Sequence, residues 1–223
     1  MKRLFPHALA AGIVAVSAAA CATATQGPAS SGLRPATGVS SSPAQARLDS
    51  SRPRYTAADA QFMSGMIHHH AQAVLMAAWA PSHGANQAVR ALCERIVVGQ
   101  RDEIVLMQRW LRDRHEAVPE PDTARATMPG MYHPVMMPGM LTAEQLAQLD
   151  SARGPEFDRL FLTFMIRHHQ GAITMVSQLF GARGAGEEEV VFKFASDVFA
   201  DQSTEISRMQ RMLATLLFEG RGQ

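Results

Sequence analysis

Methionine and histidine recur together at spacings that suit a metal ion. A methionine is followed three and four residues later by two histidines, and the pattern occurs twice, as Met66, His69, His70 and as Met165, His168, His169. On an α-helix this spacing brings the side chains to one face within about a turn. Imidazole suits several transition metals, whereas thioether sulfur chiefly suits soft ions such as Cu(I). The combination predicts a copper site, with other transition metals left open and with Met63 and His68 as further candidate ligands.

Two alternatives bear on this interpretation. Methionine at helical spacing is commonly core filler, and a histidine on an apolar face is commonly a hydrogen-bonded core residue. Adjacent histidines also point about 100° apart on a helix, so we expect one of each pair to face another helix. Metal binding is favoured because the pair recurs and because a second group of such residues gathers in a Pro-rich segment. That group comprises Met128, Met131, His133, Met136, Met137 and Met140.

The histidine pattern lies within a longer internal repeat. Residues 59–76 align without gaps on residues 158–175, with an offset of 99. A second block follows each copy with an offset of 102, and it pairs Gln100 with Gln202 and Glu103 with Glu205. The sequence therefore predicts a duplicated unit of helix, short loop and helix.

Hydrophobic periodicity predicts helices near residues 56–80, 86–114, 155–181 and 187–217. Pro81 and Gly84 break the first pair, and glycines at 181, 184 and 186 break the second, so both pairs should be antiparallel hairpins. Thr142 begins an additional short helix with a capping box. The expected fold is all-α: a ferritin-like four-helix bundle of two helical hairpins joined by a long crossover at about residues 116–140. Cys93 lies in an apolar-periodic run and is predicted to be a core residue.

Each long helix also carries one carboxylate with a counterpart in the other copy of the repeat. Asp59 corresponds to Asp158, and Glu103 corresponds to Glu205. A di-iron oxidase of the ferritin type needs Glu-x-x-His on two helices, and neither glutamate satisfies this. If the first hairpin turns near residue 82, Glu103 lies level with Phe62 and Met63 rather than with the histidines. A structural role is favoured for these carboxylates, with a separate polar cluster as the alternative.

The amino-terminal part differs from the rest. Lys2 and Arg3 precede a short apolar stretch, which indicates a signal peptide over residues 1–20 rather than a membrane span. Small residues before Cys21 resemble a lipobox and predict lipidation of that cysteine, with simple signal cleavage as the alternative. Residues 21–52 are rich in Ala, Ser, Thr, Pro and Gly and predict a disordered tether before a domain over residues 53–217. The net charge of +1 gives no indication of nucleic-acid binding.

The repeated Met-Ile-x-His-His motif resembles the bacterial family called domain of unknown function 305 (DUF305). The resemblance covers about residues 53–217 and includes Met-Pro-Gly-Met at 128–131 and 137–140 and Phe157-Asp158. One departure from the family pattern is that the first motif has His68 at the position where proline is common, and the second has Arg167 there. The family is similar to ferritin-like bundles and includes a periplasmic copper-binding protein, so the resemblance implies metal handling, most plausibly of copper.

The expected function is therefore sequestration or delivery of Cu(I) by an exported periplasmic or cell-envelope lipoprotein. Its expected partners are the metal ion and, through the lipid anchor, the membrane, while homo-oligomerisation is left open. Metal release is expected on acidification, near the ordinary pKa of imidazole. Two alternatives remain: a ferritin-like metal-dependent oxidoreductase, and a metal-free interaction module of the envelope. Catalysis is the less favoured interpretation.

Overall fold

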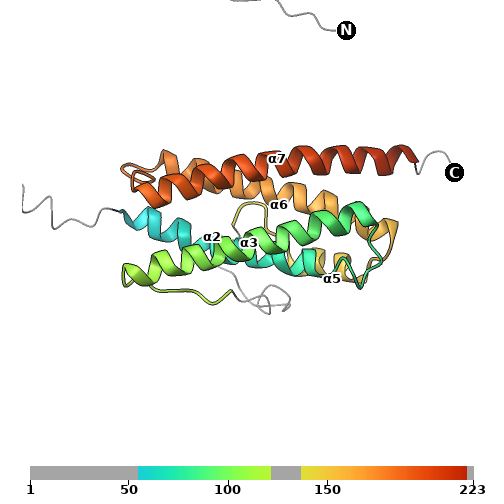
Figure 1. Ribbon diagram of the computed structural model, residues 1–223, viewed down its shortest axis with the longest axis horizontal. Coiled ribbons are helices and arrows are strands. Elements are labelled where there is room, and N and C mark those ends of the chain that lie inside the picture. The colour runs from blue at the N-terminus through green and yellow to red at the C-terminus, as the bar shows by residue number, and fades with distance from the viewer. Residues whose placement is uncertain (1–54, 122–136, 220–223) are drawn as a thin grey trace, which may run out of the picture. The chain divides into compact units, whose positions relative to one another are not determined.

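Long helices pair into two hairpins in the computed structural model, which describes residues 55–121 and 137–219 (Figure 1). The first hairpin consists of α2 (Ala57–Ala78) and α3 (Gln87–Asp113), and the second of α6 (Pro155–Gly181) and α7 (Glu189–Glu219). The hairpins meet chiefly along α2 and α6, and the short helix α5 (Ala143–Ser151) packs on α6. The predicted all-α bundle is confirmed. Within the described ranges, no helix has both the length and the apolar character needed to cross a bilayer.

Helix caps tie each hairpin to the loop of the other. Thr56 and Asp59 form a capping box at the start of α2, and Asp59 Oδ1 also accepts from the Gly186 N–H at 2.6 Å in the α6–α7 loop. In the same way, Asp158 near the start of α6 accepts from the backbone and side-chain amides of Asn86, the N-cap of α3. Such caps satisfy the backbone donors at a helix start. The structural role predicted for Asp59 and Asp158 agrees with these contacts.

The register of the first hairpin differs from the prediction. After α2 ends, the chain keeps a helical path, because His83 N–H donates to Trp79 O at 3.0 Å and Ala85 N–H donates to Ala80 O at 3.2 Å. The chain therefore reverses at about Ala85 rather than near residue 82. As a result, Glu103 reaches His70, and the prediction that it would lie level with Phe62 and Met63 was wrong.

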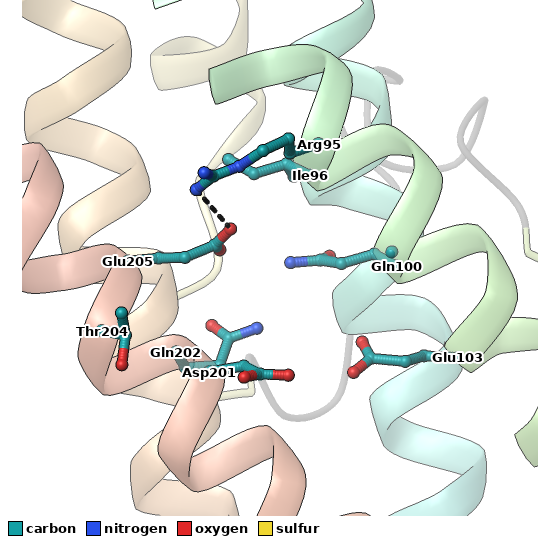
Figure 2. A pocket seen from close by; sticks show the side chains of 9 residues that line it. Arg95, Ile96, Gln100, Glu103, Asp201, Gln202, Thr204 and Glu205 are labelled. Carbon is teal, nitrogen blue, oxygen red and sulfur yellow. Dashed lines mark ion pairs between the residues drawn. The ribbon is translucent and has the colours of Figure 1, made fainter. Parts of the chain in front are cut away.

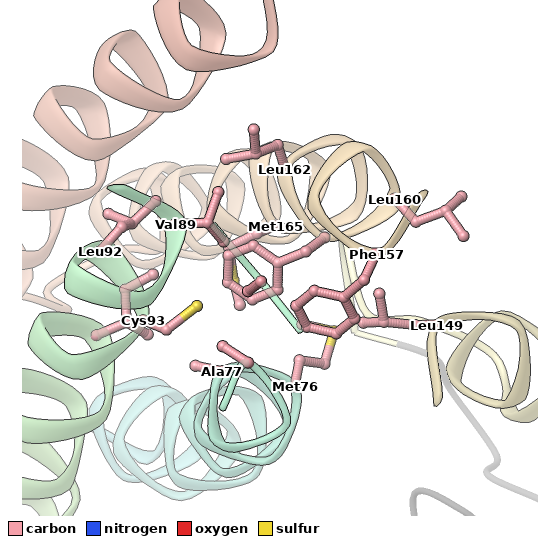
Figure 3. Packing of buried hydrophobic residues seen from close by; sticks show 14 of the residues in the cluster. Met76, Ala77, Val89, Leu92, Cys93, Leu149, Phe157, Leu160, Leu162 and Met165 are labelled. Carbon is pink, nitrogen blue, oxygen red and sulfur yellow. The ribbon is translucent and has the colours of Figure 1, made fainter. Parts of the chain in front are cut away.

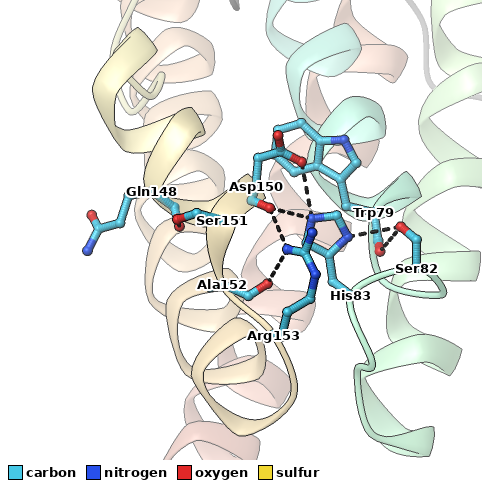
Figure 4. Close-up of polar contacts among 8 residues, drawn as sticks. All are labelled: Trp79, Ser82, His83, Gln148, Asp150, Ser151, Ala152 and Arg153. Carbon is cyan, nitrogen blue, oxygen red and sulfur yellow. Dashed lines mark hydrogen bonds and ion pairs between the residues drawn. The ribbon is translucent and has the colours of Figure 1, made fainter.

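A polar cluster joins α5 to the turn between α2 and α3 (Figure 4). His83 is buried, and its Nε2 lies 2.8 Å from the Asp150 carbonyl oxygen and 3.1 Å from Asp150 Oδ1. Its Nδ1 lies 2.9 Å from Ser82 Oγ. Arg153 donates to the same Asp150 carbonyl at 2.5 Å. These contacts fix the point at which the chain returns from the crossover to the bundle.

Two separate apolar clusters form the core. One contains the carboxyl-terminal half of α2 and the amino-terminal halves of α3 and α6, including Cys93 and Phe157 (Figure 3). The other contains the opposite halves of these helices, including Phe62 and Trp110. Cys93 is 2% exposed, which confirms its predicted core role, and burial raises the pKa of its thiol. Each long helix passes from one cluster to the other near its middle, and the polar residues of the site lie there.

Candidate metal centre

A buried polar layer separates the two apolar clusters. It comprises His69, His70, Gln100, His168, His169 and Gln202, none of them more than 4% exposed. In the described parts of the chain, every buried side-chain nitrogen or oxygen without a hydrogen-bond partner belongs to one of these six residues. A buried polar atom left without a partner costs about 1–3 kcal/mol. Buried polar groups are nearly always hydrogen-bonded in folded proteins, so such a concentration of unpartnered atoms calls for an explanation.

His69 on α2 and His168 on α6 meet at the centre of this layer. Their ring centroids lie 3.9 Å apart, with an angle of 40° between the ring planes. His69 Nε2 lies 3.0 Å from the carbonyl oxygen of Pro138, a distance at which the ring N–H donates to the carbonyl. His69 Nδ1 and both ring nitrogens of His168 have no partner among the described residues. One histidine of each motif therefore faces its counterpart across the α2–α6 contact, as expected from the 100° offset.

Burial keeps both of these rings neutral at physiological pH. Desolvation, assisted by the neighbouring His70, lowers the pKa of His69 to about 3. Desolvation and the proximity of His69 lower the pKa of His168 well below its ordinary value. A neutral imidazole carries a nitrogen lone pair, which is the form that binds metal ions. The unpartnered nitrogens are thus ready to act as ligands without first losing a proton.

The second histidine of each motif is held by a glutamate from the neighbouring helix. His70 Nε2 lies 2.6 Å from Glu103 Oε2, and His169 Nε2 lies 2.7 Å from Glu205 Oε2. In both rings Nδ1 remains without a partner. A carboxylate on one ring nitrogen fixes the orientation and tautomer of the ring and raises the basicity of the other nitrogen, the arrangement common around metal-binding histidines.

Thioether sulfur lies close to the histidine layer. Met63, Met66 and Met165 have no exposed surface; the first two pack in one apolar cluster, whereas Met165 packs in the other. Met137 reaches α2 from the crossover, since a Cβ added to Gly65 would lie 3.3 Å from its sulfur. Gly65 is one helical turn before His69, so Met137 approaches the same part of α2.

The end of the crossover lies directly on α6. A Cβ added to Gly171 would lie 1.9 Å from the Pro138 carbonyl oxygen, and Gly139 takes a φ of +79°, which favours glycine. Gln72 holds the same segment by accepting from Leu141 N–H at 2.8 Å and donating to Leu141 O at 3.1 Å. Residues 137–141 therefore cover the His69 side of the centre.

The structure thus brings together all four motif histidines. It buries Met63 and Met66 in one apolar cluster and Met165 in the other. His68 is half-buried on α2. Met131, His133, Met136 and Cys21 lie outside the described residues. In the described ranges, no three His, Cys, Asp or Glu side chains gather closely enough to form a metal cluster by themselves. Sequence reasoning paired Glu103 with Glu205 and Gln100 with Gln202 but did not place them at the centre, and it missed Pro138 and Gly171.

These features define a class of helical bundle in which two hairpins enclose a buried histidine layer. The chain belongs to the DUF305 family, described as a domain of unknown function, whose sequence profile matches residues 59–213. The resemblance seen in the sequence is therefore confirmed. No curated protein matches the chain.

Several solved structures share the fold. A DUF305 fragment from Deinococcus radiodurans has a TM-score of 0.59 and 30% identity, covering 73% of this chain and 99% of that one. A DUF305 protein from Streptomyces coelicolor, assigned as secreted, has a TM-score of 0.59 and 27% identity, covering 71% and 92%. CopM in its Cu(I)-bound form has a TM-score of 0.54 and 27% identity, covering 70% and 96%. CopM has also been solved with Cu(II) and with silver.

Proposed function

We propose that this protein binds Cu(I) as its cargo at the buried histidine layer, limiting free copper or passing it to a partner by ligand exchange. The observation that carries the proposal is the contact of His69 with His168, in which three buried ring nitrogens lack partners. Buried nitrogen without a partner is costly in the metal-free protein, and a bound metal ion would offset that cost. The similarity to CopM, solved with Cu(I) and silver, supports a soft ion.

The donor set fits a soft cation. His69 and His168 would supply neutral nitrogen. Met66 and Met165 precede them by three residues in the chain, and Met137 approaches α2 one turn before His69. Thioether and imidazole together select Cu(I) over hard ions. His70 and His169, oriented by Glu103 and Glu205, would offer further nitrogen or hold the layer in register. Met63 and His68 remain candidate ligands on α2, as do Met131, His133 and Met136 in the crossover.

The proposal is tested by competition for Cu(I) against a coloured chelator. The double variant H69L/H168L is expected to bind Cu(I) at least about 100-fold more weakly, because it removes the two central nitrogen donors. Leucine fills the space with an apolar group, so the helical circular-dichroism spectrum should persist. His115→Asn is the matched control: His115 is an exposed histidine at a φ of +58°, which asparagine tolerates. Unchanged Cu(I) affinity in H69L/H168L would overturn the site assignment.

We also propose that the protein works in the cell envelope, with residues 1–20 as a signal peptide, Cys21 as a lipid-modified residue, residues 21–52 as a tether and residues 53–217 as the metal-binding domain. The support is the sequence pattern of the first 52 residues and the similarity to a DUF305 protein assigned as secreted. Cys21→Ala is expected to release the mature protein from membranes into the soluble envelope fraction. Intact mass spectrometry of the wild type should find a diacylglyceryl group, and an unmodified mature chain would contradict lipidation.

A further inference from the structure

A groove lies between α3 and α7 (Figure 2). Its lining includes Glu103 and Glu205, the two glutamates that contact the histidine layer. Its volume is about 240 Å³, and it is open to solvent. Two pairs of residues that the sequence repeat relates to each other line it from opposite walls: Gln100 and Glu103 from α3, and Gln202 and Glu205 from α7. Carboxylate and amide groups therefore line both walls of the groove.

The two glutamines have no structural explanation in the described residues. Each is 4% exposed. Neither the oxygen nor the nitrogen of the Gln100 amide has a hydrogen-bond partner, and the amide oxygen of Gln202 also lacks one. Figure 2 shows both side chains directed from their helices into the groove. An amide without partners can turn its oxygen toward a ligand, so two such groups directed at an open space from opposite walls are positioned for a cation that binds oxygen.

Negative charge concentrates at the same place. Glu103 and Glu205 line the groove, and each contacts a histidine through Oε2, so that Oε1 takes no part in that contact. Asp201 adds a third carboxylate to the lining of the groove. Among the described residues that line the groove, the one cation is Arg95, whose Nη2 lies 3.9 Å from Glu205 Oε1 and whose side chain is 53% exposed. An arginine so loosely held can move away at little cost.

We propose that this groove binds a hard divalent cation through the carboxylates of Glu103 and Glu205 and the amide oxygens of Gln100 and Gln202. Carboxylate and amide oxygen are the ligands preferred by Ca²⁺, Mg²⁺ and Mn²⁺, whereas sulfur and nitrogen of the buried layer suit a soft ion. The protein would then hold two classes of cation at neighbouring sites. This site does not rest on the copper proposal, because its donors are oxygen atoms on different helices.

The proposal is tested by adding Mn²⁺ to the copper-free, full-length mature protein. Binding is measured as the loss of the electron paramagnetic resonance signal of free Mn²⁺. The wild type is expected to bind one Mn²⁺ that excess Ca²⁺ displaces. Q100L/Q202L, which keeps both carboxylates, is expected to bind at least about tenfold more weakly, and E103Q/E205Q should lose binding. E94Q/E189Q is the matched control, since Glu94 and Glu189 are exposed carboxylates on the same two helices and their replacement changes the net charge equally.

The outcomes separate a built site from general acidity. Equal weakening in E94Q/E189Q, or wild-type affinity in Q100L/Q202L, would mean that Mn²⁺ responds only to surface charge, and the proposal would be overturned. Absence of saturable Mn²⁺ binding by the wild type up to about millimolar concentration would overturn it as well. Cu(I) affinity is measured in separate samples without Mn²⁺, so failure here leaves the histidine-layer proposal to its own test.

Discussion

A protein carrying Gly171→Ala is expected to lose about 2–4 kcal/mol of its free energy of unfolding and to melt roughly 5–15 °C lower than the wild type. The added methyl group would lie 1.9 Å from the Pro138 carbonyl oxygen and 2.7 Å from Gly139 Cα, so residues 137–141 must leave α6. That movement breaks the bond from His69 to Pro138 and both bonds from Gln72 to Leu141. Thermal and urea unfolding followed by circular dichroism measure the loss.

Gly99→Ala provides a control of opposite sign. Gly99 lies inside α3, and a Cβ added there meets nothing within 4 Å. Alanine is the better helix former, so this variant should gain about 0.5–1 kcal/mol. If Gly171→Ala were as stable as Gly99→Ala, the crossover could not pack against α6 as described, and the cover over His69 would be lost from the account of the site.

The architecture was predictable because the duplication provides two independent copies of the pattern for each type of helix. Apolar positions at steps of three and four located the long helices to within about two residues, and Thr142 correctly marked the start of α5. Local signals of this kind depend on residues close in the sequence. The register within the first hairpin depended instead on where the chain reverses. Pro81 predicts the break, but backbone hydrogen bonds carry the helical path on to Ala85.

That register error hid the role of the glutamates. Moving the point of reversal from residue 82 to about residue 85 shifts the pairing along α2 by about six residues, nearly two helical turns, which carries Glu103 from the level of Phe62 into reach of His70. The sequence does contain a sign of this role. Gln100 and Glu103 recur as Gln202 and Glu205, and in each copy the two residues are about one helical turn apart. Polar residues at core-facing positions are unusual, so their recurrence indicates a function. Polar pairs retained by both copies of a repeat could have been read as part of the histidine site.

The path of the crossover was beyond local reasoning. Its close approach to α6 needs glycine at 139 and at 171, which are distant in the sequence and complementary only when packed. Gly171 also breaks the similarity of the two motifs, because Gln72 stands at its repeat-equivalent position and binds Leu141 instead. The second copy of the repeat thus leaves room for residues 137–141 at Gly171, and the first copy holds them through Gln72. The two faces of the histidine layer consequently differ, with residues 137–141 on one side and the open α3–α7 groove on the other.

Lowering the pH from about 7 to about 4.5 is expected to cost the metal-free protein about 2.5 kcal/mol of unfolding free energy through His69 alone. The pKa of His69 falls from 6.5 to about 3 on folding. Between these values the unfolded chain binds the proton and the folded chain does not, so stability is complete above about pH 6.5 and declines as the pH falls toward 3. His168, lowered in the same direction, adds to the decline. Urea unfolding at a series of pH values measures this slope.

H69L/H168L isolates the contribution of the pair, because the His70–Glu103 and His169–Glu205 contacts and His83 are present in both proteins. The variant should lose less stability than the wild type over this interval, by the contribution of the two buried rings, and parallel curves would contradict the buried, neutral pair. The same pKa values revise the expected release of metal. A proton competes with Cu(I) for His69 only near the lowered pKa, so acidification to the ordinary range of imidazole should leave the ion bound. Transfer by ligand exchange, rather than mild acid, is then the route by which this centre would give up its cargo.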